Sequence, residues 1–86
     1  MDINKLIAIV KKKLKNGIII ENIKVEDKSF LHVGHKGNDK KKFHLKILIN
    51  SKELSKMSRI QSNKKIYKIL DKEIKKYIHS LQILIA

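Results

Sequence analysis

The chain has 86 residues, a formal net charge of +13, and neither cysteine nor proline. This length supports one hydrophobic core, so we expect a single domain over residues 1–86. The lack of cysteine excludes disulfides, cysteine-based zinc sites and thiol nucleophiles, and is typical of a reducing compartment such as the cytoplasm. The longest apolar runs are far shorter than a membrane span.

The positive charge has two interpretations. It is the electrostatic signature of a nucleic-acid-binding protein or of another anionic partner. Alternatively, it reflects a compositional bias that scatters lysine over every exposed face, because Arg59 is the single arginine. Arginine and aromatic side chains, which usually read and stack on bases, are nearly absent. The charge alone does not decide between the two.

The first segment has the spacing of an amphipathic helix, with apolar residues at Ile3, Leu6, Ile7, Val10 and Leu14. Asp2 is a suitable N-cap, and Gly17 is a suitable stop. From Ile20 the apolar period changes to two, which predicts a half-buried strand that ends near Asp27.

Residues 28–42 are mostly polar and include Gly34, Gly37, Asn38 and Asp39, which predicts a loop. Strict alternation predicts a strand over 43–50, and a turn follows to Met57. Ser58 is positioned to cap a second helix. The buried face of this helix is predicted from the spacing of Ile60, Tyr67, Leu70 and Ile74, supported by Ile66 and Ile69. Asp71 and Glu73 lie among lysines, which predicts an exposed helix face. Residues 80–86 predict a last strand with Leu81, Ile83 and Ile85 inward.

The order is therefore helix, strand, strand, helix, strand. The first two strands are joined by a loop and should be antiparallel. The third follows a helix that returns the chain, so it should be parallel to the second. The sequence predicts an α+β fold, a three-stranded mixed sheet with helices on one face.

This topology brings the four histidines toward one end of the sheet. His32 and His35 lie in the loop, His44 begins the second strand, and His79 precedes the third. Imidazole is a good ligand for zinc, copper and iron. Each histidine also has a simpler interpretation. His44 alternates with Lys46 and would be a solvated strand residue. The loop histidines would be solvent-exposed, and His79 would close the helix C-terminus.

No residue pattern predicts catalysis. The sequence has no pair of carboxylates placed for acid–base work, no nucleophile elbow and no phosphate loop, so we expect a non-enzymatic protein. Gly34 to Gly37 matches the GxxG loop of KH domains, but that loop joins two helices, and this one lies between strands.

Several landmarks together resemble the BolA family. One stretch resembles "V-x-D-x-S-x-x-H-x-G-H" through Val25, Asp27, Ser29, His32, Gly34 and His35. The family's "H-F-x-V" strand resembles His44, Leu45 and Ile47. Its "V-Y-x-x-L-x-x-E" helix resembles Ile66, Tyr67, Leu70 and Glu73. Its "I-H-A-L" signature resembles Ile78, His79, Ser80 and Leu81.

The resemblance implies a class II KH-like fold. It also implies a non-enzymatic adaptor that partners a monothiol glutaredoxin in iron–sulfur cluster assembly or iron homeostasis. A bridging two-iron, two-sulfur cluster is then held by the glutaredoxin cysteine, a glutathione thiol and histidine from the BolA partner. His79 matches the C-terminal metal ligand. His32 best matches the second ligand, and His35 is the alternative. Such a protein is expected to be monomeric when alone.

The alternative implied by the resemblance is a KH-like nucleic-acid-binding transcriptional regulator. Two departures bear on it. The family's Arg-His-Arg triplet in the second helix is replaced by Ser62, Asn63 and Lys64, and its "F-x-G" turn by Leu54, Ser55 and Lys56. The lost arginines weaken the nucleic-acid interpretation.

Overall fold

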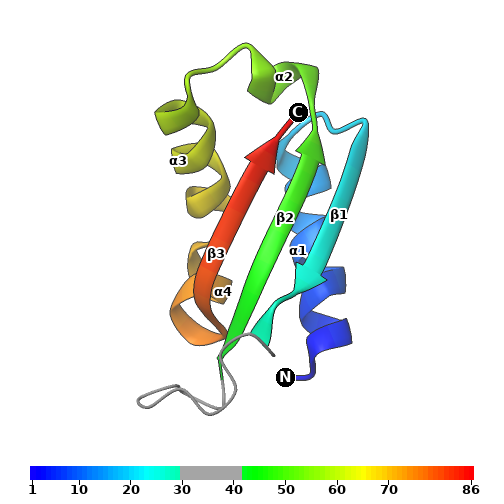
Figure 1. Cartoon of the computed structure of the whole chain (residues 1–86), viewed down its shortest axis with the longest axis vertical. Helices are drawn as coiled ribbons and strands as arrows, with labels where there is room; N and C mark the ends of the chain where they lie inside the picture. Colours follow the sequence, from blue (N-terminus) through cyan, green and yellow to red (C-terminus); the bar gives the residue numbers. More distant parts are fainter. Residues whose placement is uncertain (30–41) are drawn as a thin grey trace.

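The computed structural model describes residues 1–29 and 42–86. Its elements are α1 (Ile3–Gly17), β1 (Asn22–Asp27), β2 (Phe43–Asn50), α2 (Lys52–Ser55), α3 (Arg59–Ile69), α4 (Asp71–Lys76) and β3 (Ile78–Ile85). The three strands form one layer, with the helices behind it (Figure 1). No helix in these two ranges is both long and apolar enough to cross a membrane.

The sheet has the order β1-β2-β3, so β2 is central. β1 is antiparallel to β2, with Val25 opposite Ile47. β2 is parallel to β3, with Ile47 opposite Ile83. Both predicted directions are confirmed. As a result β1 ends, and β2 and β3 begin, at the same end of the sheet (Figure 1).

The core lies between the inward face of the sheet and the helices. Alternation places Leu45, Ile47 and Ile49 of β2 inward, and each is almost fully buried. From α1, the predicted residues Leu6, Val10 and Leu14 cover them. The inward residues of β3 pack against this core from its edge, as the alternation predicted. The fold class is confirmed.

The two ends of α1 are set by local chemistry. The Asp2 carboxylate accepts a hydrogen bond from the backbone N–H of Lys5 at 2.8 Å, which confirms the predicted cap. The helix ends at Gly17, as predicted. A Cβ at this position would lie 2.9 Å from Ile69 Cδ1. Glycine therefore lets α1 and α3 approach closely.

The segment after β2 contains more helix than its sequence predicts. The expected turn contains α2, whose N-cap Ser51 accepts a hydrogen bond from Leu54 N–H. Ser58 caps α3 as predicted, and Gln61 completes a capping box. The expected single helix then divides at Leu70, where ψ is 14°, and α4 follows.

The predicted buried face of the second helix is confirmed at Leu70 and Ile74 but is wrong at two positions of α3. Ile60 and Tyr67 are 68% and 42% exposed, whereas Ile66 is fully buried. Apolar residues occur on several sides of this helix, so their spacing alone did not identify the core side. Ser62 is buried because its hydroxyl donates to the Arg59 carbonyl at 3.0 Å, which satisfies the polar group locally.

Glu73 is buried, and the prediction of an exposed face is wrong at this position. Its carboxylate accepts a hydrogen bond from Lys13 Nζ at 2.6 Å, which links α4 to α1. Its second oxygen, Oε1, is buried without a hydrogen-bond partner among the described residues. The partner lies 60 residues earlier in the chain, so no local pattern could identify the pair.

Glu53 forms a second junction between elements. Its carboxylate accepts hydrogen bonds from Lys65 Nζ at 2.5 Å and from the backbone N–H of Ile19 at 3.2 Å. These contacts join α2, α3 and the segment after α1. The hydrogen bond from Lys65 is the main cause that holds the pKa of the Glu53 carboxyl below its ordinary value of 4.5, and the Ile19 N–H adds to it.

We expect Lys13→Met to reduce the free energy of unfolding by about 1–3 kcal/mol, because it leaves the buried Glu73 carboxylate without its hydrogen-bond donor. The double variant Lys13→Met/Glu73→Leu should regain most of this loss, since no buried charge remains. Urea denaturation at 25 °C measures both. If the stability lost in the double variant equals the sum of the losses in the two single variants, Lys13 and Glu73 are not energetically coupled.

The Glu53 contacts predict a pH dependence of stability. A carboxyl with a lowered folded-state pKa stabilises the fold above its ordinary pKa, and this contribution is lost as pH falls through the lowered value. Glu53→Gln should therefore flatten the decline in stability as pH falls from above 4.5 through the lowered pKa of Glu53. Lys65→Met should flatten this decline less than Glu53→Gln, because the Ile19 N–H still lowers the pKa of the Glu53 carboxyl. Equal slopes in all three proteins, from denaturation series at each pH, would disprove this role.

Candidate functional site

Two of the four histidines meet at the end of the sheet where β2 and β3 begin. The ring centroids of His44 and His79 are 4.9 Å apart, with an interplanar angle of 65°, an edge-to-face arrangement. Parallel pairing of β2 with β3 brings these residues together, as the topology predicted. His32 and His35 lie in residues 30–41, outside the described part of the chain.

An irregularity in the strand pairing sets the position of His79. Phe43 is paired with Ile78, but the next residue of β2, His44, is paired with Ser80. His79 is thus the extra residue of a β-bulge. Bulges of this kind turn a side chain away from the regular alternation. The His79 side chain is exposed at this point, so its imidazole is accessible to another molecule.

His44 is buried, and the prediction of a solvated strand residue is wrong. Only 4% of it is exposed. Its Nδ1 lies 2.6 Å from Ser80 Oγ. Its backbone N–H donates to Ser29 Oγ at 3.0 Å, and its carbonyl accepts from Lys28 N–H at 2.7 Å. His44 lies on the same face of β2 as Lys46, two residues later, but His44 is covered by other residues.

His79 does not close a helix. The C-terminus of α4 is capped by the backbone N–H of Tyr77, which donates to the Glu73 carbonyl at 2.8 Å. His79 lies beyond this cap, within β3. The helix-dipole interpretation of this residue is therefore wrong, and a role toward solvent or a partner remains.

The hydroxyl of Ser80 is the polar group that sequence reasoning missed. It forms a hydrogen bond with Nδ1 of His44. This bond orients the His44 ring, which packs edge-to-face against His79. A second group that orients a ligating side chain is common at metal sites. The sequence did contain a signal, because Ser80 directly follows His79. Only the bulge, however, places Ser80 opposite His44.

The described residues do not form a complete metal site. Within residues 1–29 and 42–86, no three His, Cys, Asp or Glu side chains are grouped so that they could hold a metal ion. They offer instead one exposed imidazole beside an oriented, buried one. A single imidazole fits a shared site, in which other molecules supply the remaining ligands.

Charged side chains of both signs lie at the end of the sheet that carries His79, and Glu26 and Asp27 are the acidic ones at the end of β1. Lys28 follows β1, Lys42 precedes β2 and Lys76 precedes β3, so all three lie at this end of the sheet. Lys28 pairs with Glu26 at 3.2 Å, and this contact is the main cause that lowers the pKa of the Glu26 carboxyl.

Comparison with solved structures supports the fold. The BolA domain of SufE1 from Arabidopsis thaliana is 28% identical, with a TM-score of 0.77 over 91% of this chain and 86% of that one. BolA1 from Arabidopsis thaliana is 25% identical, with a TM-score of 0.74 over 91% and 86%. A bol-like protein from Babesia bovis, 15% identical, shares the fold with a TM-score of 0.70 over 91% and 79%.

The sequence comparison extends this likeness to the family. Among curated proteins no match was found. The family model described as BolA-like protein matches residues 14–86, which include both strands that carry His44 and His79. The resemblance predicted from the sequence motifs is confirmed, and the chain belongs to the BolA-like family.

Proposed function

We propose that this protein is a non-enzymatic adaptor that partners a monothiol glutaredoxin and helps to hold a bridging two-iron, two-sulfur cluster. The role would lie in iron–sulfur cluster assembly or iron homeostasis. The observation that carries the proposal is the exposed imidazole of His79, placed by a β-bulge beside His44 at the end of the sheet where β2 and β3 begin. Membership of the BolA-like family supports it.

An incomplete site is what a shared cluster requires. The glutaredoxin cysteine and a glutathione thiol would supply two ligands, and this chain would supply His79. The second ligand of this chain would be His32, or else His35. Because the chain has no cysteine, its ligands would be histidines. Histidine in place of thiolate raises the reduction potential of an iron–sulfur cluster.

The absence of cysteine also fits the proposed location in the cytoplasm. A cysteine-free adaptor suits the reducing cytoplasm, and we expect it to be monomeric without its partner.

Nucleic-acid regulation is not favoured. At the positions of the family's Arg-His-Arg triplet, Ser62 and Asn63 carry no charge, so Lys64 is the one cation there.

We expect His79→Ala to weaken the cluster complex formed from this protein, a monothiol glutaredoxin, glutathione, iron and sulfide. The loss of a ligand should change the visible absorption and circular dichroism of the complex and speed cluster loss. Gln82→Ala is the matched control, because Gln82 is an exposed residue of the same strand. The variants His32→Ala and His35→Ala identify the second ligand by the same spectra.

The ligand assignment is wrong if His79→Ala and Gln82→Ala give the same spectrum and the same lifetime of the complex. Failure of the two wild-type proteins to form a complex in size-exclusion chromatography, with or without cluster, would overturn the partnership itself.

Ser80 is expected to act as a positioning residue. Ser80→Ala removes the hydrogen bond to His44 Nδ1 and should lower the free energy of unfolding by about 1 kcal/mol. It should also change the ¹⁵N chemical shifts of both imidazoles and the circular dichroism of the cluster complex. Ser80→Thr keeps a hydroxyl and should restore these signals. If Ser80→Ala changes stability but neither set of spectra, Ser80 is merely structural.

A further inference from the structure

The free edge of β3 has backbone groups without partners. In a parallel pair, alternate residues of a strand bond to its neighbour. Ala86 N–H donates to the Ile49 carbonyl at 2.9 Å. Gln82 and Leu84 therefore face β2, whereas Leu81, Ile83 and Ile85 direct their N–H and C=O groups away from the sheet. The Tyr67 hydroxyl donates to the Leu81 carbonyl at 3.4 Å. Among the described residues, no group bonds the outward N–H and C=O of Ile83 or Ile85.

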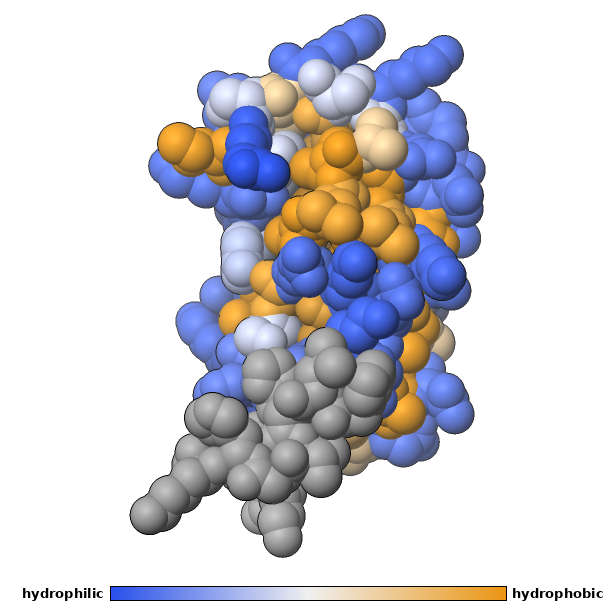
Figure 2. Space-filling view, in the orientation of Figure 1, coloured by the Kyte–Doolittle hydropathy of each residue, from blue (hydrophilic) through white to orange (hydrophobic). Residues whose placement is uncertain are grey.

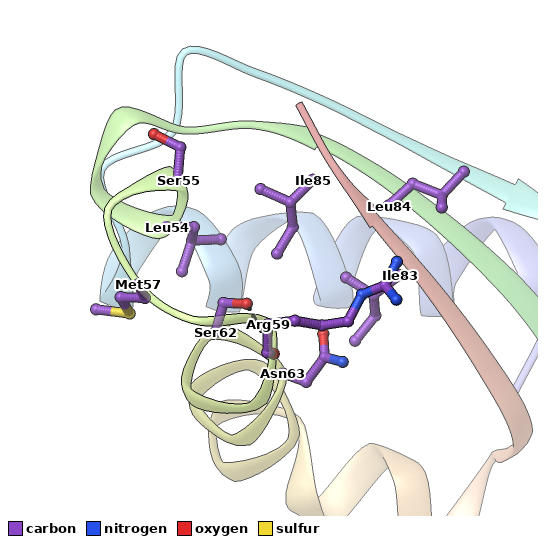
Figure 3. Close-up of a pocket in the computed structure, with 9 residues that line it drawn as sticks. All are labelled: Leu54, Ser55, Met57, Arg59, Ser62, Asn63, Ile83, Leu84 and Ile85. Atoms are coloured by element: carbon purple, nitrogen blue, oxygen red, sulfur yellow. Dashed lines mark hydrogen bonds between the residues drawn. The ribbon is translucent and has the colours of Figure 1, made fainter.

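A cleft of about 300 Å³ lies along this part of the edge. One side is formed by Ile83, Leu84 and Ile85 of β3. The other side comes from α2, α3 and the turn between them, including Arg59 and Asn63. Figure 3 shows the Arg59 side chain extending from α3 toward Ile83 and Leu84. The cleft therefore combines unpaired strand backbone with a cationic side chain.

β3 lacks the features that usually protect an edge strand. It has eight residues, none of them Lys, Arg, Asp, Glu or Pro, although charged side chains and proline commonly block strand edges. Leu84 is 38% exposed on the outer face of the sheet. Figure 2, which looks onto this face, shows an apolar area beside hydrophilic ones. A strand added at this edge would bury apolar surface as well as backbone.

The α3 side of the cleft is positive and has no acidic residue. Arg59, Asn63 and Tyr67 follow one another at four-residue spacing, so they lie along one stripe of α3. The helix contains no Asp or Glu. Arg59 is exposed and forms no ion pair within residues 1–29 and 42–86. Its guanidinium is therefore available to a carboxylate, which it binds well through two parallel hydrogen bonds.

We propose that the edge of β3 binds an extended segment of an acidic protein by strand addition. The backbone of the segment pairs with Ile83 and Ile85. Side chains of an added strand alternate between two faces. Acidic side chains on one face contact Arg59, and apolar side chains on the other contact Leu84. A second copy of this chain is disfavoured as the occupant, because each copy carries a net charge of +13.

This surface is separate from the candidate cluster site. Residues 79 and 85 lie at opposite ends of β3, about 20 Å apart at the rise of an extended strand. The proposal does not rest on the glutaredoxin partnership. A variant at Arg59 should leave the cluster spectra unchanged, so failure of one proposal is distinguishable from failure of the other.

The test is a titration of the ¹⁵N-labelled full chain with an acetylated octapeptide in which Glu and Val alternate. We expect the largest amide shifts at Ile83 and Ile85, and slower hydrogen exchange at both. One control peptide has the same composition arranged as four Glu followed by four Val. A second control alternates Lys and Val. Both should bind at least roughly tenfold more weakly, because they lose either the alternation or the charge match.

Variants test the two halves of the cleft. Arg59→Gln should weaken binding roughly tenfold. Lys68→Gln removes the same charge from the opposite side of α3 and should leave binding unchanged. Ile83→Pro removes an N–H that points away from β2, so it spares the ladder and should abolish binding. Far-ultraviolet circular dichroism checks its fold, and Arg59→Gln remains a valid test if that fold is lost.

Several outcomes would overturn the proposal. One is that the alternating Glu and Val peptide does not bind. Another is that Arg59→Gln and Lys68→Gln weaken its binding equally. A third is that the peptide binds without shifting the amide signals of Ile83 and Ile85. Tighter, Arg59-dependent binding of a twelve-nucleotide oligothymidine would make the cleft a nucleic-acid site instead. Protection of the Ile83 amide without peptide, together with a dimer in sedimentation, would make the occupant a second copy.

Discussion

Parallel pairing of β2 with β3 requires the chain to return the full length of the sheet before β3 begins. Residues 51–77 make this return as α2, α3 and α4, and their apolar residues cover the inner face of the sheet. The return has two functional consequences. It places the first residues of β2 and β3 side by side, which brings His44 next to His79. It also leaves β3 at an edge, where, among residues 1–29 and 42–86, no group bonds the outward backbone of Ile83 and Ile85.

The bulge at His79 is a local exception to this regular pairing. Alternation along a strand would place successive side chains on opposite faces. Because His79 is skipped in the register, Ser80 lies opposite His44 and bonds its ring, while His79 lies exposed beside that ring. The bulge thus leaves the His79 imidazole exposed to a partner, beside the buried His44 ring that Ser80 holds. Regular pairing through this point would separate the serine from the histidine it holds.

Two carboxylates fix the helices that make the return. Glu73 joins α4 to α1 through Lys13, and Glu53 joins α2 to α3 through Lys65. Both lie among a large excess of lysine, so each has a cation within reach, and the remaining lysines leave the surface strongly basic. A basic surface attracts anionic partners in general. The two proposed surfaces differ in what they offer a partner. The bulge presents the imidazole of His79, whereas the edge of β3 presents backbone N–H and C=O groups.

The sequence by itself determined the elements whose signals are local and repeated. Alternation in residues 43–50, the helical period after Asp2 and the caps at Asp2 and Ser58 depend on neighbours within four residues, so they predicted α1, β2 and the start of α3. The motifs also indicated the BolA-like family. The loop histidines His32 and His35 lie outside the described residues, and their roles stay predictions.

Only the tertiary structure decided which polar groups are buried. The apolar residues of α3 lie on several of its sides, so the core side was chosen by packing against α1 and the sheet. The buried Glu73 is paired with Lys13 from 60 residues away, and the buried His44 ring contacts His79 and Ser80 from another strand. The bulge at His79 depends on pairing between two strands. A chain read one segment at a time contains no signal for such contacts, because their energy exists only when distant residues meet.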